Sequence, residues 1–320
     1  MGAVIFLWSL NYVVGKVGLE EMPALAMGSF RVLGAGIASL PALFFGRKGK
    51  RGTKTGGGER SDERSEGMRE IAPRSNSALS LAWTVTYLGF FGVVLNQGGF
   101  TVGLDYTSIS HSSLIIACAP ILILLFSWLA GFEALTLRKA MGIALAFGGA
   151  AVIAVERGRG SGGANVAGDL ITALASLGLA IYTVMGKRAV MEHGPVRVAL
   201  LMNIAAGALV SPVAVWQFRE LSRTGQLASI GVSGWGALIY LIVMASLLSR
   251  ILYFWALRYM TPARVGSVSY LPPVGAMLLG FFLLGEPITV SAAVAGILVI
   301  AGVYAIETHP RKLEAEEDFA

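Results

Sequence analysis

Long apolar runs separated by short polar connections fill most of this chain. Apolar and polar residues do not alternate within the runs, which argues against the strands of a β-barrel. A helix needs about 20 residues to cross about 30 Å of hydrocarbon, and most of the runs have that length. The pattern therefore predicts an all-α integral membrane protein with ten transmembrane helices. Their approximate ranges are 2–19, 23–46, 79–103, 109–130, 137–155, 168–186, 196–218, 234–257, 262–284 and 288–307.

Composition supports lipid as the solvent of these helices. The 320 residues are 55% hydrophobic and only 14% charged, whereas soluble domains carry about 25% charged residues. The single cysteine, Cys118, excludes an internal disulfide and a multi-cysteine metal site. The first apolar run lacks a basic leader and a small-residue cleavage site, so we interpret it as a retained span rather than a signal peptide.

The distribution of Lys and Arg predicts the topology. Residues 47–77 are rich in Gly, Ser and charge, which favours a disordered cytoplasmic loop. With the N-terminus in the cytoplasm, 18 of the 25 Lys and Arg residues fall on the inner side, 4 on the outer side and 3 within spans. We expect both termini to be cytoplasmic and the protein to lie in the cytoplasmic (inner) membrane of a prokaryote. The net charge of +6 then reflects topology, not nucleic-acid binding.

The second part of the chain repeats the first. At an offset of 153 residues seven positions match, most of them not simply apolar: Leu104 with Leu257, Tyr106 with Tyr259, Ser108 with Thr261, Pro120 with Pro273, Glu133 with Glu286, Thr136 with Thr289, and Gly149 with Gly302. At an offset of 171, Gly15-Lys16 matches Gly186-Lys187 and Pro41 matches Pro212. We expect five-helix repeats at 1–155 and 156–307 and a cytoplasmic tail at 308–320. Because five is odd, the second repeat is inverted, and a central cavity is expected between the two.

Three cations fall within the predicted spans. Arg31 lies roughly 12 Å deep at 1.5 Å per residue, and no carboxylate is placed mid-span. One interpretation is that Arg31 faces a wet cavity and attracts a substrate carboxylate or phosphate; the other is that it caps carbonyls or pairs with Glu20 or Glu21. Lys16 could line the cavity, snorkel or pair with Glu20. Arg250 could line the cavity or snorkel to the cytoplasm.

Polar and aromatic residues within the spans complete the predicted cavity lining. Trp8, Asn11 and Tyr12 share one helix face. Asn11, Asn96 and Asn203 are expected to point inward, either toward substrate or toward neighbouring helices. The candidate substrate-binding residues are Trp8, Asn11, Tyr12, Lys16, Arg31, Tyr87, Asn96, Gln97, Tyr182, Asn203, Ser246, Arg250 and Tyr270.

Prolines and acidic residues recur at matched repeat positions. Pro120, Pro272 and Pro273 lie inside predicted helices and predict helix breaks, either hinges or, as we favour, fixed bends. Glu133 and Glu286 precede predicted helices. For them we favour capping or helix tying over proton coupling.

Three segments resemble a known family. Residues 262–304 (PARVGSVSYLPPVGAMLLGFFLLGEPITVSAAVAGILVIAGVY) are similar to the C-terminal signature of EamA-type carriers of the drug/metabolite transporter (DMT) superfamily. Residues 95–136 (LNQGGFTVGLDYTSISHSSLIIACAPILILLFSWLAGFEALT) resemble the matching signature of the first half, and FLWSLNYVVGKVGL with SFRVLGAGI resembles the opening pair of helices. The resemblance implies a basket of ten helices that moves small solutes such as amino acids, metabolites or drugs.

The leading function is therefore a secondary transporter that works by alternating access, with export as one option for its direction and a homodimer left open. No Walker loop supports ATP drive, and no cofactor or metal is expected. His111, the histidine nearest a span, lies near a span end, so we favour facilitated or weakly coupled transport and expect His111→Ala to retain it.

Two other classes of protein are less consistent with the sequence. A membrane-embedded enzyme acting on a lipid or other membrane substrate needs paired Asp, a Ser–Lys pair or a His-rich metal set. The chain has only three histidines. An ion channel would need a charged ring or filter loop, and the sequence offers none.

Overall fold

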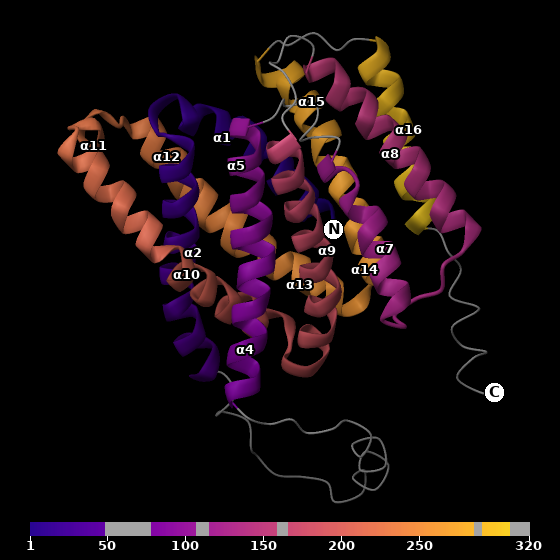
Figure 1. Cartoon of the computed structure of the whole chain (residues 1–320), viewed down its shortest axis with the longest axis horizontal. Helices are drawn as coiled ribbons and strands as arrows, with labels where there is room; N and C mark the ends of the chain where they lie inside the picture. Colours follow the sequence, from indigo (N-terminus) through magenta and orange to yellow (C-terminus); the bar gives the residue numbers. More distant parts are fainter. Residues whose placement is uncertain (49–77, 107–114, 159–165, 285–289, 308–320) are drawn as a thin grey trace, which may run out of the picture.

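The computed structural model describes residues 1–48, 78–106, 115–158, 166–284 and 290–307, and all regular structure in these ranges is helical (Figure 1). The predicted all-α fold is therefore confirmed for the described residues. The elements in chain order are α1 (Gly2–Glu21), α2 (Ala24–Lys48), α4 (Ala78–Gly89), η1 (Phe90–Gly98), α5 (Gly99–Tyr106), α7 (Ala119–Leu129), α8 (Leu137–Gly158), α9 (Val166–His193), α10 (Pro195–Arg223), α11 (Gln226–Ser229), α12 (Val232–Tyr240), η2 (Leu241–Leu248), α13 (Ser249–Tyr259), α14 (Pro262–Ser267), η3 (Val268–Tyr270), α15 (Leu271–Leu284) and α16 (Val290–Glu307).

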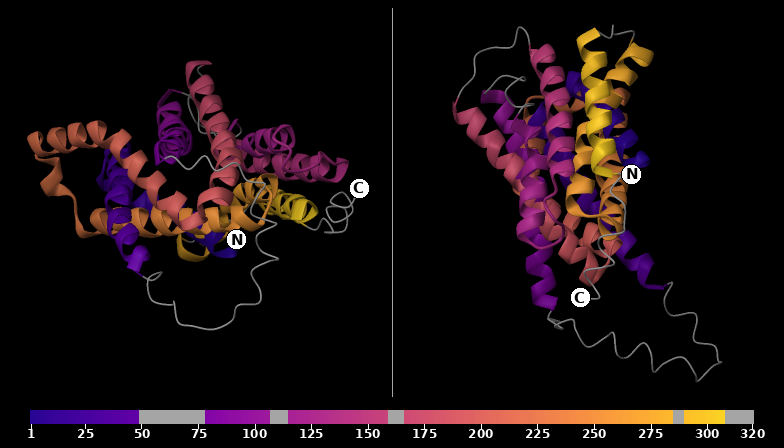
Figure 2. Two further views of the ribbon diagram at one scale, coloured as in Figure 1. Left: turned by 90° about the horizontal axis from the view of Figure 1, so that it is seen from below. Right: turned by 90° about the vertical axis from the view of Figure 1, so that its right-hand side faces the viewer.

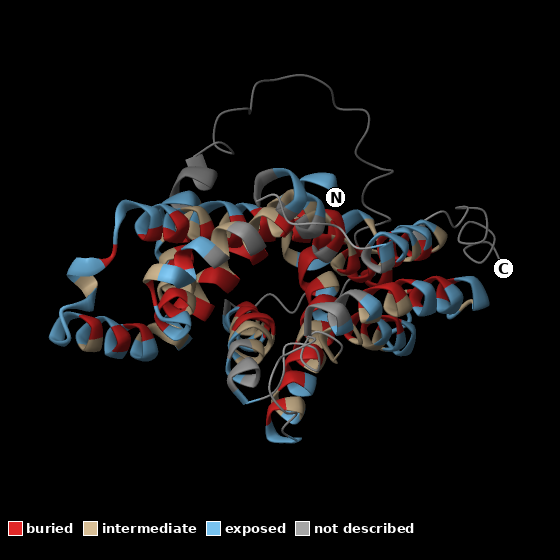
Figure 3. Cartoon of the chain, turned by 90° about the horizontal axis from the view of Figure 1, so that it is seen from above, coloured by how far each residue is buried: buried red, intermediate tan, exposed pale blue. Residues whose placement is uncertain are grey.

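Several helices have the length and hydropathy of membrane spans. Within the described ranges five meet both criteria: Ala24–Leu43, Leu79–Gly98, Val166–His193, Pro195–Arg223 and Val232–Tyr259. Shorter apolar helices are Gly2–Asn11, Ala119–Leu129 and Ala293–Ile306. Buried residues face the middle of the bundle and exposed residues its periphery (Figure 3). Large apolar side chains lie on that periphery, such as Trp83 and Phe282, which is the surface that lipid requires. The ten-span count stays a prediction.

Two of the long helices contain π-helical windings. The first is η1, continuous with α4 and α5, and the second is η2, continuous with α12 and α13. Shifting η1 by the repeat offset of 153 places it over much of η2. π-helical turns are rare and frequently accompany functional sites. Asn96, Gln97 and Ser246 all lie on these two windings.

The predicted prolines mark breaks between helices. α7 begins at Ala119, after a turn at Ala117 and Cys118, so Pro120 lies in its first turn. Pro272 likewise lies in the first turn of α15, directly after the 3₁₀ turn η3. A first turn tolerates proline because its N–H groups have no intrahelical acceptor. Both prolines therefore lie at helix breaks within the predicted spans 109–130 and 262–284, as the sequence analysis expected. The side chain of Pro273 lies outside the described part of the chain.

A hydrogen bond joins the two breaks. Tyr270 of η3 donates its hydroxyl to the carbonyl of Ala117 at 2.8 Å. These two residues are 153 positions apart, which is the repeat offset. The contact satisfies a carbonyl that the break leaves without a helical donor, so it favours a fixed bend over a hinge at this point.

Helices α8 and α16 pack closely side by side (Figures 1 and 2). A Cβ atom built on Gly142 would lie 2.8 Å from the carbonyl oxygen of Gly302, and one on Gly149 would lie 2.5 Å from that of Ala295. The lower-numbered position of α8 thus meets the higher-numbered position of α16, so the two helices are antiparallel. The offset of 153 converts each of these contacts into the other, as in a contact about a twofold axis.

The same relation holds where α2 crosses α10. A Cβ atom on Gly36 would lie 3.2 Å from the Cα atom of Gly207. These glycines are 171 positions apart, which is the second offset found in the sequence. A residue that meets its own counterpart lies on the axis that relates the two segments. Small residues allow this approach, as is usual between helices in lipid.

The remaining helices form two packing groups. In the α1 group, α1 packs on α12, α13 and α15; in the α9 group, α9 packs on η1, α5 and α7. Each group combines an element from one half of the chain with elements from the other half. We count α14 with the α1 group because it continues through η3 into α15. The groups meet where α13 contacts α9 and where α14 contacts α7.

Glu21 fastens the end of α1 to the start of α12. Its carboxylate accepts hydrogen bonds from the Gly231 N–H at 2.6 Å, the Gly234 N–H at 3.2 Å and the Ser233 hydroxyl. The Ser233 hydrogen bond, followed by the Gly231 one, lowers the pKa of Glu21 below its ordinary value. The contact therefore stabilises the fold above the unfolded-state pKa of about 4.3, and this contribution is lost as the pH falls through the lower folded-state pKa.

We predict that Gly149→Ala lowers the free energy of unfolding by about 1–3 kcal/mol, because the new methyl group would overpack the α8–α16 contact. Gly148→Ala is the matched control, since a Cβ atom there meets nothing within 4 Å. The control should unfold at the wild-type midpoint or slightly above it, because alanine favours a helix. Thermal unfolding of the detergent-purified chain measures both. Equal midpoints for the two variants would contradict the packing described here.

Candidate functional site

Two arginines lie among aromatic side chains within the helix bundle. We call Trp8, Arg31, Tyr182, Ser246, Arg250 and Tyr253 the arginine–aromatic cluster. Arg31, on α2, donates from Nε to the Ser246 hydroxyl at 2.6 Å and from Nη2 to the Ala245 carbonyl at 3.3 Å. It is thus joined to η2, and Glu21 is bound to α12 instead. Arg31 therefore bonds a carbonyl, as one interpretation expected, and it forms no ion pair with Glu20 or Glu21 among the described residues.

Arg250 is the more deeply buried cation. It is 8% exposed, and its Nη1 contacts the Met202 sulfur at 4.0 Å. It does not snorkel to solvent, because α9 and α10 pack against α13. Arg31 is bonded to Ser246, four positions before Arg250 on the continuous η2–α13 helix, so the two cations lie about one helical turn apart along it. Within the described part of the chain neither forms an ion pair, although an unpaired cation at the bilayer centre costs at least about 2.5–3.5 kcal/mol.

Aromatic rings pack beside Arg250. Tyr253 stacks with Tyr182 at a centroid distance of 5.9 Å and lies 5.6 Å from the Trp8 ring. The Tyr253 hydroxyl shares a hydrogen bond of 2.9 Å with Thr183. Tyr253 and Thr183 were not among the predicted site residues. Tyr253 could have been found from its spacing, because it follows Arg250 by three positions and so shares its helix face.

The three predicted asparagines have different surroundings. Asn96 donates from Nδ2 to the Ala175 carbonyl at 2.9 Å, so it links η1 to α9. Asn203 is 2% exposed, and its Nδ2 has no hydrogen-bond partner among the described residues. The Oδ1 atom of Asn11 is also buried without a partner. A buried amide that lacks partners is costly in lipid, so Asn11 and Asn203 have spare hydrogen-bonding capacity.

Other predicted site residues are not joined to this cluster by any contact described here. Tyr87 is 42% exposed and packs on Phe91 at a centroid distance of 4.4 Å. Tyr270 is occupied by the contact with Ala117. Gln97 is partly buried and has an interaction of its own. The side chains of Tyr12 and Lys16 lie outside the described residues, and so does His111.

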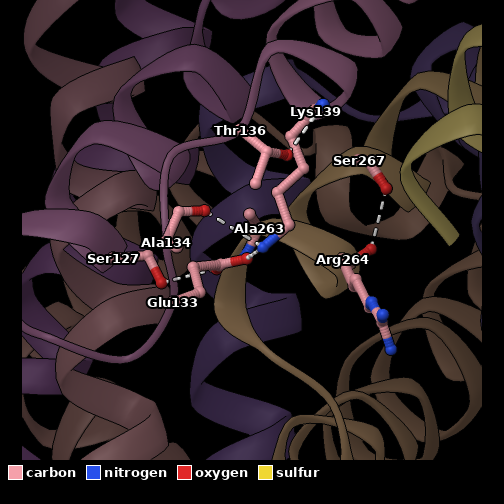
Figure 4. Close-up of polar contacts among 8 residues, drawn as sticks. All are labelled: Ser127, Glu133, Ala134, Thr136, Lys139, Ala263, Arg264 and Ser267. Carbon is pink, nitrogen blue, oxygen red and sulfur yellow. Dashed lines mark hydrogen bonds and ion pairs between the residues drawn. The ribbon is translucent and has the colours of Figure 1, made fainter. Parts of the chain in front are cut away.

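A second buried polar group lies where α7, α8 and α14 meet (Figure 4). We call Ser127, Glu133, Lys139 and Ala263 the Glu133 cluster. The carboxylate of Glu133 accepts from the Ser127 hydroxyl at 2.6 Å, from the Ala263 N–H at 2.9 Å and from the Lys139 ammonium at 2.8 Å. The prediction that Glu133 ties adjacent helices is confirmed. Glu286 lies outside the described residues.

Lys187 of α9 makes a further contact at this end of the bundle. Its ammonium donates to the carbonyls of Arg258 and Met260, each at 3.1 Å. These carbonyls end α13 and precede α14. Cations are favoured at a helix C-terminus because the helix dipole and its free carbonyls attract them. Lys187 therefore joins the α9 group to the α1 group.

Comparisons with known proteins place the chain among membrane transporters. The model of the "EamA-like transporter family" matches residues 1–155 and 166–308. The chain is 27% identical over 304 residues to the "Uncharacterized inner membrane transporter YedA" of Escherichia coli K12, covering 94% of this chain and 87% of the relative. It is 25% identical to a "Probable amino-acid metabolite efflux pump" of Salmonella typhimurium, covering 94% and 91%. A solved structure, described only as "Crystal structure of protein", has the same fold with a TM-score of 0.70 at 19% identity, over 98% of this chain and 96% of that one.

We predict that Glu133→Ala destabilises the fold by about 3–5 kcal/mol, because it leaves the Lys139 ammonium buried without its carboxylate. Glu192→Ala is the control. It removes an ion pair in which both side chains are more than half exposed, so it should change stability by less than about 1 kcal/mol. The double variant Glu133→Ala/Lys139→Ala should regain part of the loss. Thermal unfolding measures all three variants. A Glu133→Ala variant as stable as wild type would show that the Glu133–Lys139 pair does not stabilise the fold.

Proposed function

Because the chain belongs to the EamA-like transporter family, we propose that it is a secondary transporter that carries a small solute across the cytoplasmic membrane by alternating access. The observation that carries the proposal is the arginine–aromatic cluster, which places two cations without a carboxylate partner among the described residues inside a bundle whose periphery is apolar. Intramembrane ionisable residues commonly mark solute pathways. The Salmonella relative is named as an amino-acid metabolite efflux pump, which supports export as the direction of transport and an amino-acid metabolite as the solute.

We further propose that the fold consists of two inverted five-helix repeats, at 1–155 and 156–307, with both termini cytoplasmic. Three observations support this architecture. The family model matches two separate segments. The antiparallel α8–α16 contacts are images of each other, and Gly36 meets its own counterpart Gly207. Inverted repeats of this kind place the substrate site between them, near the midplane.

The contacts between the two packing groups suggest how access alternates. Three hydrogen bonds cross between the groups near the Glu133 cluster: Ala263 to Glu133, and Lys187 to the carbonyls of Arg258 and Met260. This end carries Arg138, Lys139, Lys187 and Arg258, so under the proposed topology it faces the cytoplasm. The structure then represents a state closed toward the cytoplasm. Opening that end would separate α14 from α7 and α13 from α9.

A cysteine bridge across the two groups tests alternating access. A Cβ atom on Gly266 of α14 would lie 3.3 Å from the Cβ atom of Ile123 of α7, which is close to disulfide geometry. We predict that oxidation of Ile123→Cys/Gly266→Cys, in a Cys118→Ser background, abolishes uptake by proteoliposomes and that a reductant restores it. The readout is saturable uptake of labelled amino acids and of their deaminated carboxylates.

The control bridge lies within one group. A Cβ atom on Gly99 of α5 would lie 3.4 Å from that of Ala175 of α9, so Gly99→Cys/Ala175→Cys should form a bridge that leaves uptake intact. Uptake that persists with the Ile123–Gly266 bridge closed would overturn alternating access between these groups. Absence of saturable uptake of every probe by the unbridged protein would count against the transport function itself.

A further inference from the structure

Arg31 is hydrogen-bonded to Ser246, which precedes Arg250 by four positions on the continuous η2–α13 helix, and neither cation has a carboxylate partner among the described residues. Arg250 has five N–H donors. Among the described residues their one side-chain contact is a weak one, from Nη1 to the Met202 sulfur at 4.0 Å. Arg31 uses Nε and Nη2 and retains Nη1. A buried cation and a half-buried cation with unused donors can together bind an anion. Guanidinium groups match carboxylate and phosphate groups especially well.

The two halves of the chain have matching small residues at the helix crossings but different residues at the positions of the cations. At the helix crossings, positions related by the repeat offsets keep small residues, such as Gly36 with Gly207 and Gly149 with Gly302. Within the cluster the same offsets relate Arg31 to Met202 and Arg250 to Gln97. The two halves therefore diverge where the charge is placed. A ligand without twofold symmetry needs different side chains from the two halves, whereas helix packing about a twofold axis does not.

The neighbouring rings indicate the body of the ligand. Trp8 and Tyr182 pack on Tyr253, which follows Arg250 by three positions on α13, and the rings offer flat apolar faces. No acidic side chain of the described ranges joins them. An ammonium group on the ligand would therefore meet two cations and no carboxylate, and the arrangement disfavours amino-acid zwitterions and organic cations.

We propose that the arginine–aromatic cluster binds an organic anion with an aromatic or apolar body and without an ammonium group, and that Arg31 and Arg250 hold its anionic head. That the bound anion is then transported rests on the proposed function, whereas its binding can be tested separately. Carboxylate and phosphate heads share the chemistry that two guanidinium groups recognise, and the probes distinguish them.

The first experiment is thermal unfolding of the full, detergent-purified chain with probes of matched shape. The probes are 3-phenylpropanoate, phenethyl phosphate, 3-phenylpropanamide, 3-phenylpropylamine and L-phenylalanine. A ligand that binds only the folded state raises the unfolding midpoint. We expect one or both anions to raise it by several degrees, and the amide, the amine and the amino acid to raise it much less. Equal shifts for anion and amide, or a larger shift for the amine or amino acid, would overturn the proposal.

The second experiment removes the cations. Arg250→Gln and Arg31→Gln should each weaken binding of the effective anion at least tenfold, and Arg250→Lys should retain part of the affinity because it keeps the charge. Arg197→Gln is the control on an exposed residue of α10 and should bind as wild type does.

The ligand-free midpoints separate a binding role from a structural one. Removing one of two repelling cations should leave the midpoint of Arg250→Gln unchanged or raise it. A lowered midpoint together with an unchanged anion shift would assign Arg250 to the fold and overturn the proposal. Saturable uptake of an uncharged or cationic solute, unaffected by both arginine variants, would overturn the anion site and leave the transport function standing.

Discussion

Water is missing from the hydrocarbon core, so every polar group there must find a partner within the protein or accept a large cost. Most of the described polar groups satisfy this constraint. Tyr270 donates to the carbonyl that the helix break at Ala117 leaves free, and Asn96 donates to the Ala175 carbonyl of the neighbouring helix. The carboxylate of Glu133 binds three donors. These contacts fix helix positions because no competing water is present to replace them.

Small residues supply the second part of the scaffold. Lipid gives no hydrophobic drive for helix association, so close van der Waals contact must hold the helices together. At Gly36 and Gly207, and along α8 and α16, a single added methyl group would meet backbone atoms at 2.5–3.2 Å. The contacts fall at positions related by the repeat offsets, which ties the internal repeat in the sequence to the geometry of the bundle.

The apolar pattern and the repeat offsets were enough to predict a helical bundle and the helix breaks near the prolines. Three features needed coordinates. The π windings leave no trace in periodicity, because they change only the local hydrogen-bond register. The depth of Arg250 depends on α9 and α10 covering α13, so its distance from the span end was misleading. Tyr253 shares a helix face with Arg250 in the sequence, but its ring contacts with Trp8 and Tyr182 become visible only in the structure.

The buried Arg250 guanidinium lies beside the Met202 thioether, a weak acceptor that does not offset the cost of burying the charge. Replacing either cation with an apolar residue would remove its desolvation cost and the repulsion between the pair. The rest of the bundle shows that this chain can pair a buried charge fully, since Lys139 and Glu133 do so at 2.8 Å. The two clusters therefore differ. The Glu133 carboxylate has all of its hydrogen bonds within the protein and links helices, whereas the arginine–aromatic cluster has N–H donors that no described residue uses. Unused binding capacity of that sort stabilises the protein only when a ligand occupies it, which is the condition for a site that must bind a solute and release it.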